Sequence, residues 1–270
     1  MKRVVFLIFA VSLLTTTVFK GQSIMTMTTS SDKVQIFLAG SGTFAIDWGD
    51  GSEIMSYTLG EYKARWFRIR NEYSYNYDSE TSHTITIIGE NITHVDCFNN
   101  KATSLDVSRN PVLIYLDCRY NQLTSLDVSK NTKLSKLIVQ GNQLTSLDIS
   151  NNIAIAGLSC GNNMIKNLDV SNNKALTRLC YTSNPNMYPM FPFASNEEAS
   201  AYADAVNNLF MSLNSNSGKK IIQISGLSDK EVSYDKSIAK KKGWKIVEIK
   251  VKETTKNGVK SKNIFVPDIV

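Results

Sequence analysis

Four aspartates recur at a spacing of 21 residues and are the most regularly placed ionisable side chains: Asp106, Asp127, Asp148 and Asp169. Carboxylates held close together can work as an acid–base pair, and a row of them can attract calcium. The alternative is structural, because an aspartate can accept hydrogen bonds from turn amides or from the serine two residues later. We expect the structural role, since an aspartate in every unit suits a ladder better than a single site.

Three of the four cysteines follow the same period. Cys97, Cys118 and Cys160 share one position of the repeat, and Cys180 lies one residue earlier in its unit. A spacing equal to the repeat, without any CxxC pair, does not indicate a metal site. Strands about 4.8 Å apart would bring the α-carbons of Cys97 and Cys118 within disulfide range, although parallel side chains suit the disulfide torsion poorly. We expect buried free thiols, with Cys180 the most reactive towards alkylation.

The two histidines, His83 and His94, are the remaining candidates for catalysis. The sequence places no serine or cysteine nucleophile beside either, and it contains neither a glycine-rich phosphate loop nor HExxH. Asp47 and Asp50 in DWGDGSE offer oxygens that calcium could use, but they lack the full twelve-residue loop, so we expect a turn. The sequence predicts no enzyme, no cofactor and no metal, and a hydrolase is the least favoured hypothesis.

A repeat of 21 residues positions most of these side chains. NQLTSLDVSKN at 121–131 recurs as NQLTSLDISNN at 142–152, and the aligned units begin at Ile92, Leu113, Leu134, Ile155 and Leu176. A fixed period of this length is typical of solenoids, in which each unit buries its apolar side chains against its neighbours. The spacing therefore predicts about five stacked coils with strands on one face.

Asparagines close both halves of each unit. Asparagine tolerates left-handed backbone, and its amide can bond to turn backbone groups. We expect two structural ladders, one of Asn100, Asn121, Asn142, Asn163 and Asn184 and one of Asn110, Asn131, Asn152 and Asn173.

The consensus LxxLxCxxNxLxxLDVSxN resembles the nested 21-residue unit of bacterial secreted or surface leucine-rich repeat proteins, over residues 92–184. Val139 and Tyr181 replace the cysteine, and Ala102 replaces a leucine. The resemblance implies contact with a protein or glycan at the bacterial surface or outside the cell.

The N-terminus predicts export. MKR precedes the apolar run VVFLIFAVSLL, the order found in secretory signal peptides, and the run is short for a membrane span. We therefore expect residues 1–22 to be a signal peptide, with an uncleaved anchor as the alternative and the only membrane contact. The predicted location is secreted or at the bacterial cell surface.

Segments before and after the repeat read as its flanking domains. VQIFLAG, TFAIDW, EIMSYTL, RWFRIR and HTITIIG alternate as strands, and IDWGDGS resembles β-sandwich domains of the polycystic-kidney (PKD) type. Downstream, Ser195 with Glu198 and Ser228 with Glu231 form helix-capping patterns, and IIQIS and WKIVEIKV read as strands. This ISGL…SIAKKKGW segment is similar to tails that follow such repeats.

The predicted class is α+β and β-rich: a leucine-rich repeat solenoid of about five coils between a small β domain and an α/β cap. The expected boundaries are 1–22 signal peptide, 23–91 β-rich N-terminal domain, 92–190 solenoid, 191–252 α/β C-terminal cap and 253–270 an unassigned basic tail.

The net charge of +6 is unevenly distributed. Thirteen lysines and six acids lie between residues 219 and 270, which leaves an acidic body once the signal is removed. Lysines in such a tail could touch an anionic partner, but they are interleaved with predicted elements and not gathered in one block. We expect a solvated tail, no nucleic-acid partner and a monomer.

One half of each unit varies at its outward positions while the TSLDVSxN half hardly changes. By strand alternation the variable side chains share the outer face of one sheet. Aromatic and arginine residues in such a cluster are types that carry binding energy, so we expect a protein or glycan ligand there. Uneven drift of an exposed face in a structural envelope protein without a ligand is the alternative. The candidate binding residues are His94, Phe98, Tyr115, Arg119, Lys136, Gln140 and Arg178.

Overall fold

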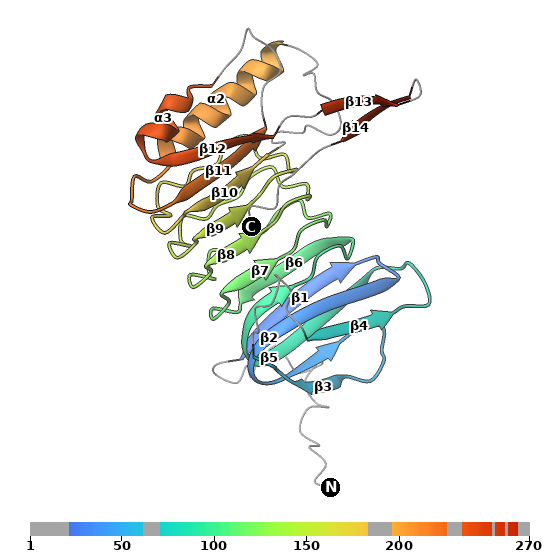
Figure 1. Ribbon diagram of the computed structural model, residues 1–270. Coiled ribbons are helices and arrows are strands. Elements are labelled where there is room, and N and C mark those ends of the chain that lie inside the picture. Colours follow the sequence, from blue (N-terminus) through green and yellow to red (C-terminus); the bar gives the residue numbers. More distant parts are fainter. Residues whose placement is uncertain are drawn as a thin grey trace.

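Short parallel strands, each 21 residues after the last, form the centre of the molecule (Figure 1). The computed structural model describes residues 22–61, 71–182, 196–225, 234–249, 252–256 and 259–263. Within these residues, twelve strands form one long sheet and two more form a separate pair. The central strands are β7 (Tyr115–Asp117), β8 (Lys136–Ile138), β9 (Gly157–Ser159) and β10 (Arg178–Tyr181).

A leucine spine runs through these strands. Each strand pairs with the next in parallel at a register shift of one unit, so equivalent side chains lie directly opposite one another. Burial of these leucines removes their apolar surface from water on both sides of every coil. The spine consists of Leu116, Leu137, Leu158 and Leu179, all buried. The alignment predicted from the 21-residue period is confirmed for these residues.

The first asparagine ladder ties each coil to the one before it. The Asn142 amide nitrogen donates to the carbonyl of Val139 in its own coil and to that of Cys118 in the preceding coil, both at 2.9 Å. Its Oδ1 accepts the backbone N–H of Leu123 at 3.0 Å. Asn121 and Asn163 repeat this pattern. These buried side chains satisfy backbone groups that the turns would otherwise leave unpaired.

The second ladder joins the coils at the other corner through its amide nitrogens. Asn152 donates to the carbonyls of Val128 and Asn131, each at 2.9 Å, and Asn131 and Asn173 do the same one coil away. Asn214 continues this ladder, because its amide nitrogen donates to Asn173 O at 3.2 Å. The sequence analysis missed Asn214, which lies 41 residues after Asn173 and outside the period. Asn184, expected in the first ladder, lies outside the described residues.

Six strands form the N-terminal part: β1 (Ser23–Thr29), β2 (Lys33–Asp47), β3 (Met55–Thr58), β4 (Glu72–Asn76), β5 (His83–Asp96) and β6 (Ala102–Arg109). The long strands β2 and β5 pair with each other, and the register shifts twice between Ala39 and Phe44. A Cβ on Gly40 would lie 1.8 Å from the backbone oxygen of Asn91, so this close approach of the two strands requires glycine.

The lower end of the solenoid is closed by this N-terminal part. Strand β5 continues through residue 92 to Asp96 and pairs with β7, so the N-terminal sheet and the first coil share one strand. Strand β1 pairs with β6, which is the TSLDVS half of the first coil. Gln35 of β2 donates its backbone N–H to Asn100 Oδ1 and accepts from Asn100 Nδ2, which terminates the first asparagine ladder.

The strands expected here differ in detail from those observed. VQIFLAG and TFAIDW belong to one strand, β2, because the chain stays extended through the glycine-containing shift. Strands β1 and β4 were not predicted. The turn expected around Asp47 and Asp50 is present between β2 and β3, where each carboxylate accepts a backbone N–H from two residues later. The predicted strand at 65–70 lies outside the described residues, as does the predicted signal peptide at 1–22 except for its last residue.

Beyond β10 the sheet continues with β11 (Lys220–Ser225) and β12 (Trp244–Ile249), both parallel to their neighbours. Helices α2 (Asn196–Ser212) and α3 (Lys236–Lys241) precede these two strands. The α2 segment and the residue after it bury Val206, Leu209, Phe210 and Leu213. Both strands were predicted from IIQIS and WKIVEIKV. A separate antiparallel pair follows, β13 (Lys252–Lys256) with β14 (Val259–Asn263).

Helix α3 begins later than its predicted cap. Asp235 is the N-cap, and its Oδ1 accepts the backbone N–H of Ser237 at 2.8 Å. Ser228 and Glu231, which the sequence suggested as a capping pair, lie outside the described residues, as does Ser195. Neither described helix is both long and apolar enough to cross a membrane.

Candidate functional site

The candidate residues gather on the outer face of the parallel sheet. Strand pairing places His94, Tyr115, Lys136, Gly157 and Arg178 opposite one another in a single column, which Ile221 and Lys245 continue. Phe98, Arg119 and Gln140 lie four residues further along their coils. In this second set the Arg119 guanidinium lies 5.6 Å from the Phe98 ring centroid. The structure therefore brings all seven predicted residues onto one face.

A middle column lies between these two sets and was missed by the sequence analysis. Alternation turns every second side chain outward, so the residue after each spine leucine faces the same way as its neighbours two residues before and after it. The missed column is Asp96, Asp117, Ile138, Ser159, Cys180 and Gln223. These positions could have been found from strand alternation alone. They form the floor of the site.

An aromatic hollow of about 400 Å³ occupies the N-terminal end of the face. The rings of Phe37 and Phe98 stack with centroids 6.3 Å apart, and Arg119 lies over Phe98. Tyr120 is 51% exposed at the edge and adopts a left-handed backbone conformation, φ 55°. Asp96 is buried in the lining. Aromatic rings beside an arginine are the side chains most enriched at protein contact points.

A buried carboxylate lies beneath this patch. The Asp117 side chain is fully buried, with Oδ2 lying 3.2 Å from Arg119 Nε and 3.4 Å from the Tyr115 hydroxyl. Burial raises the pKa of Asp117, and the charge of Arg119 opposes that rise. Burial also lowers the pKa of Lys136, where Arg178 and Arg119 add to the lowering and Asp117 opposes it. The face therefore concentrates positive charge around two shielded acids, Asp96 and Asp117.

Both histidines pack against neighbouring side chains of the sheet. His83 and His94 lie at opposite ends of β5. The His83 ring stacks on Tyr77 with centroids 3.9 Å apart, and its Nε2 lies 2.9 Å from the Thr81 hydroxyl. His94 Nδ1 contacts Thr93, its ring stacks on Tyr115, and burial lowers its pKa. Both rings pack as parts of the sheet surface.

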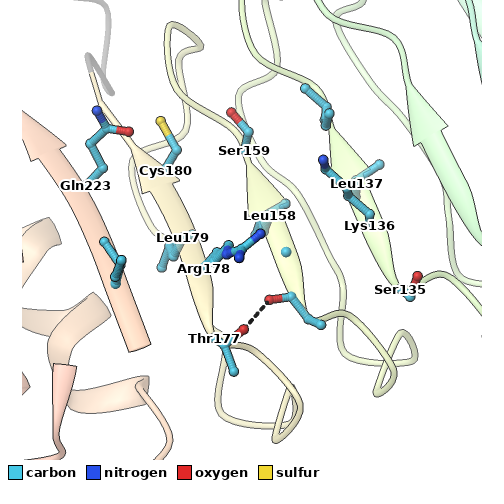
Figure 2. A pocket seen from close by; sticks show the side chains of 14 residues that line it. Ser135, Lys136, Leu137, Leu158, Ser159, Thr177, Arg178, Leu179, Cys180 and Gln223 are labelled. Carbon is cyan, nitrogen blue, oxygen red and sulfur yellow. Dashed lines mark hydrogen bonds between the residues drawn. The ribbon is translucent and has the colours of Figure 1, made fainter. Parts of the chain in front are cut away.

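A second hollow, of about 250 Å³, lies around Gly157 between the side chains of Lys136 and Arg178. Figure 2 shows Arg178 extending from β10 over β9, with Lys136 on the far side. A Cβ on Gly157 would meet only the Lys136 side chain, at 3.7 Å, so the hollow exists because this residue lacks a side chain. Gly161 differs, since a Cβ there would lie 2.4 Å from Thr182 Oγ1. Gly161 is required by packing, whereas Gly157 leaves open space.

The aspartate column forms turns. Each aspartate accepts the backbone N–H of the serine two residues later at 2.8–2.9 Å, as the structural interpretation predicted. These hydrogen bonds lower the pKa of Asp127 and Asp148. The four cysteines are free and buried. Cys180 is 9% exposed and lines the Gly157 hollow, while Tyr181 takes the inward position and donates its hydroxyl to Ile165 O at 2.7 Å.

The stacked coils have a leucine-rich-repeat-like fold. No known protein family matches the chain, and no curated protein matches it. Among solved structures it is similar to the functional domain of InlJ from Listeria monocytogenes, which is described as including a cysteine ladder. The two share 29% sequence identity, with 55% of this chain and 33% of that chain covered and a TM-score of 0.33. The chain thus spans about a third of that structure's length, and its own fold assignment rests on the register of its coils.

Proposed function

We propose that this chain is an exported, non-enzymatic leucine-rich repeat protein that binds a partner through the outer face of its parallel sheet. The observation that carries the proposal is the contrast between the two faces of the coils. On one side, side-chain amides and turn aspartates repeat almost unchanged and bond to the chain itself. On the other, aromatic, arginine and lysine side chains surround two hollows.

The extent of the outer face favours a macromolecular partner. The face extends over successive strands from β5 to β10, so it can present several contacts in a row. Binding energy at such surfaces concentrates in a few aromatic and arginine residues inside a rim that excludes water. Phe98, Arg119 and Tyr120 offer that combination in one hollow. We propose a protein as the partner and a monomer as the active state.

The test is a pull-down with the exported chain as bait against envelope and host extracts. Phe98→Ala combined with Tyr120→Asn removes both rings but leaves the Asp117–Arg119 pair intact, and asparagine tolerates the left-handed backbone at 120. Lys130→Ala combined with Lys166→Ala changes the opposite half-coils and serves as control. Both variants should keep the parent unfolding temperature.

Loss of the captured partner from the aromatic variant alone would support the proposal. Equal capture by the parent and both variants would count against this face, and it would favour an envelope protein without a specific ligand at the sheet.

A further inference from the structure

The second hollow, around Gly157, differs in chemistry from the aromatic hollow and is called the Gly157 slot below. Lys136, Gly157 and Arg178 are consecutive members of one column. The backbones of Lys136 and Arg178 are therefore two strand spacings apart, roughly 10 Å. Two long cationic side chains thus border a gap one strand wide. Arg178 is exposed, and no ion pair involves it within the part of the chain that the structure describes.

The surroundings of the slot supply positive charge and little to neutralise it. The column from His94 to Lys245 contains no acid among its paired members. Asp117 is the acid closest in register to Lys136, and it is shielded beneath Tyr115 and Arg119. An anion that enters the slot would therefore meet two cations and no exposed carboxylate of the same column.

Polar groups on the floor point to a specific ligand. Gln223 is 3% exposed and lines the hollow, and its Nε2 has no hydrogen-bond partner in the described part of the chain. A buried amide donor without a partner destabilises the fold, so a ligand group that accepts from it would remove this penalty. Ser159 donates its hydroxyl to Gln140 Oε1 at 3.2 Å, which leaves its own oxygen able to accept. The floor can thus serve both a carboxylate or carbonyl oxygen and an N–H donor.

The remaining lining distinguishes a peptide from a sugar. Ile138 and Ile221 provide an apolar surface beside the two cations. Sugars commonly stack on aromatic side chains, and the described lining residues include none, whereas an aliphatic surface beside cations suits an acidic side chain followed by an apolar one. The combination also matches the N–H and C=O groups of a peptide backbone, which Ser159 and Gln223 can meet.

We propose that the Gly157 slot binds an aspartate or glutamate side chain of a protein partner, with its carboxylate between Lys136 and Arg178 and an adjacent apolar residue against Ile138 and Ile221. This rests on the proposed function, because it names the chemistry of one part of the same face. The carboxylate makes charge-assisted hydrogen bonds to the two cations. Gln223 Nε2 donates to the peptide backbone.

The test uses fluorescent synthetic peptides with a central Glu or Asp beside Leu, Ile or Val, and matched peptides with Gln or Asn. Binding to the full chain is followed by fluorescence anisotropy at low and high salt. Acidic peptides should bind about tenfold more tightly than their amide counterparts, and high salt should weaken them. Gly157→Val fills the slot on an ordinary strand backbone and should abolish binding. Arg178→Gln and Lys136→Gln should each weaken it about tenfold, and Lys130→Gln should not.

Gln223→Leu provides a second readout. It removes the unpartnered donor, so the unfolding temperature should stay the same or rise while peptide affinity falls several-fold. If Gln223 had only a structural role, its replacement would not lower peptide affinity while leaving the unfolding temperature unchanged or higher. Unchanged affinity in this variant would remove Gln223 from the site.

Three results would overturn the proposal: no peptide binds, peptides bind equally to the Gly157→Val variant, or only an acidic heparin-type oligosaccharide binds in a Gly157-dependent way. The last result would assign the slot to a glycan. Failure here with continued loss of partner in the Phe98→Ala/Tyr120→Asn variant would leave the proposed function standing. If the peptide test and the pull-down test both fail, the outer face of the sheet is not the binding surface.

Discussion

The amide nitrogen of Asn142 donates a hydrogen bond of 2.9 Å to the backbone carbonyl of Cys118, 24 residues earlier in the chain. The same side chain also bonds Val139 O and Leu123 N, so one asparagine satisfies three backbone groups in two coils. Repetition of this arrangement explains why the sequence keeps asparagine at a fixed place in every unit. The coils are held in register by side chains as well as by strand pairing.

Asn142→Ala should destabilise the chain by about 1–3 kcal/mol, because the buried backbone N–H of Leu123 loses its acceptor, while the carbonyls of Cys118 and Val139 keep the amides of Asn121 and Asn163. Asn151→Ala is the matched control, since Asn151 is exposed and its replacement should stay within about 0.5 kcal/mol. Urea unfolding of both variants measures the difference. Equal stability of the two would contradict the ladder's role.

The glycines at 157 and 161 should respond in opposite ways to alanine. Gly161→Ala places a Cβ 2.4 Å from Thr182 Oγ1 and 2.9 Å from its backbone oxygen, and should cost about 1–3 kcal/mol. Gly157→Ala meets open space on a strand and should be neutral or stabilising by up to about 1 kcal/mol. Thermal and urea unfolding distinguish them, and the reverse order would show that the coils pack differently.

Asp117 should make stability depend on pH in a defined direction. Burial raises its pKa in the folded chain, so the folded state holds the proton more tightly than the unfolded state. The contribution of Asp117 to the free energy of unfolding therefore falls as the pH rises from about 4 through the raised folded-state pKa. Asp117→Asn removes this titration.

The free energy of unfolding of Asp117→Asn, minus that of the parent, should thus increase between pH 4 and pH 7 in urea titrations. A difference that falls over this range would mean that the carboxyl is stabilised in its charged form.

The thiols should be nearly inert in the folded chain. Burial raises the pKa of Cys97, Cys118, Cys160 and Cys180, and the thiolate is the reactive form. Alkylation at neutral pH followed by mass spectrometry should label Cys180 first and slowly, and all four rapidly in denaturant. Fast labelling of Cys118 without denaturant would contradict its burial between the coils.

Much of this structure could be predicted from the sequence because the repeat is local and regular. The period alone places Leu116 opposite Leu137 and gathers Tyr115, Lys136 and Arg178 on one face. What could not be predicted arises where the period ends. Asn214 joins the second ladder only because α2 replaces a half-coil, which stretches the spacing from 21 to 41 residues.

The candidate site was predicted in outline but without its floor. Asp117 and Gln223 face outward by alternation, yet both are buried, Asp117 beside the side chains of Arg119 and Tyr115. The slot at Gly157 likewise depends on what the adjacent coils place around it. The sequence shows a glycine at both 157 and 161, and only the surrounding atoms show that one leaves a hollow and the other avoids a clash.

Site-specific photo-crosslinking tests the binding face most directly. A benzophenone amino acid replaces Tyr120 or Arg178 on the outer face, or Lys130 or Lys166 on the opposite half-coils, and each variant is irradiated in the extract that yields the partner. We expect the same discrete adduct between the chain and its partner from positions 120 and 178, and none from positions 130 and 166. Adducts from 130 or 166, with none from 120 and 178, would contradict it.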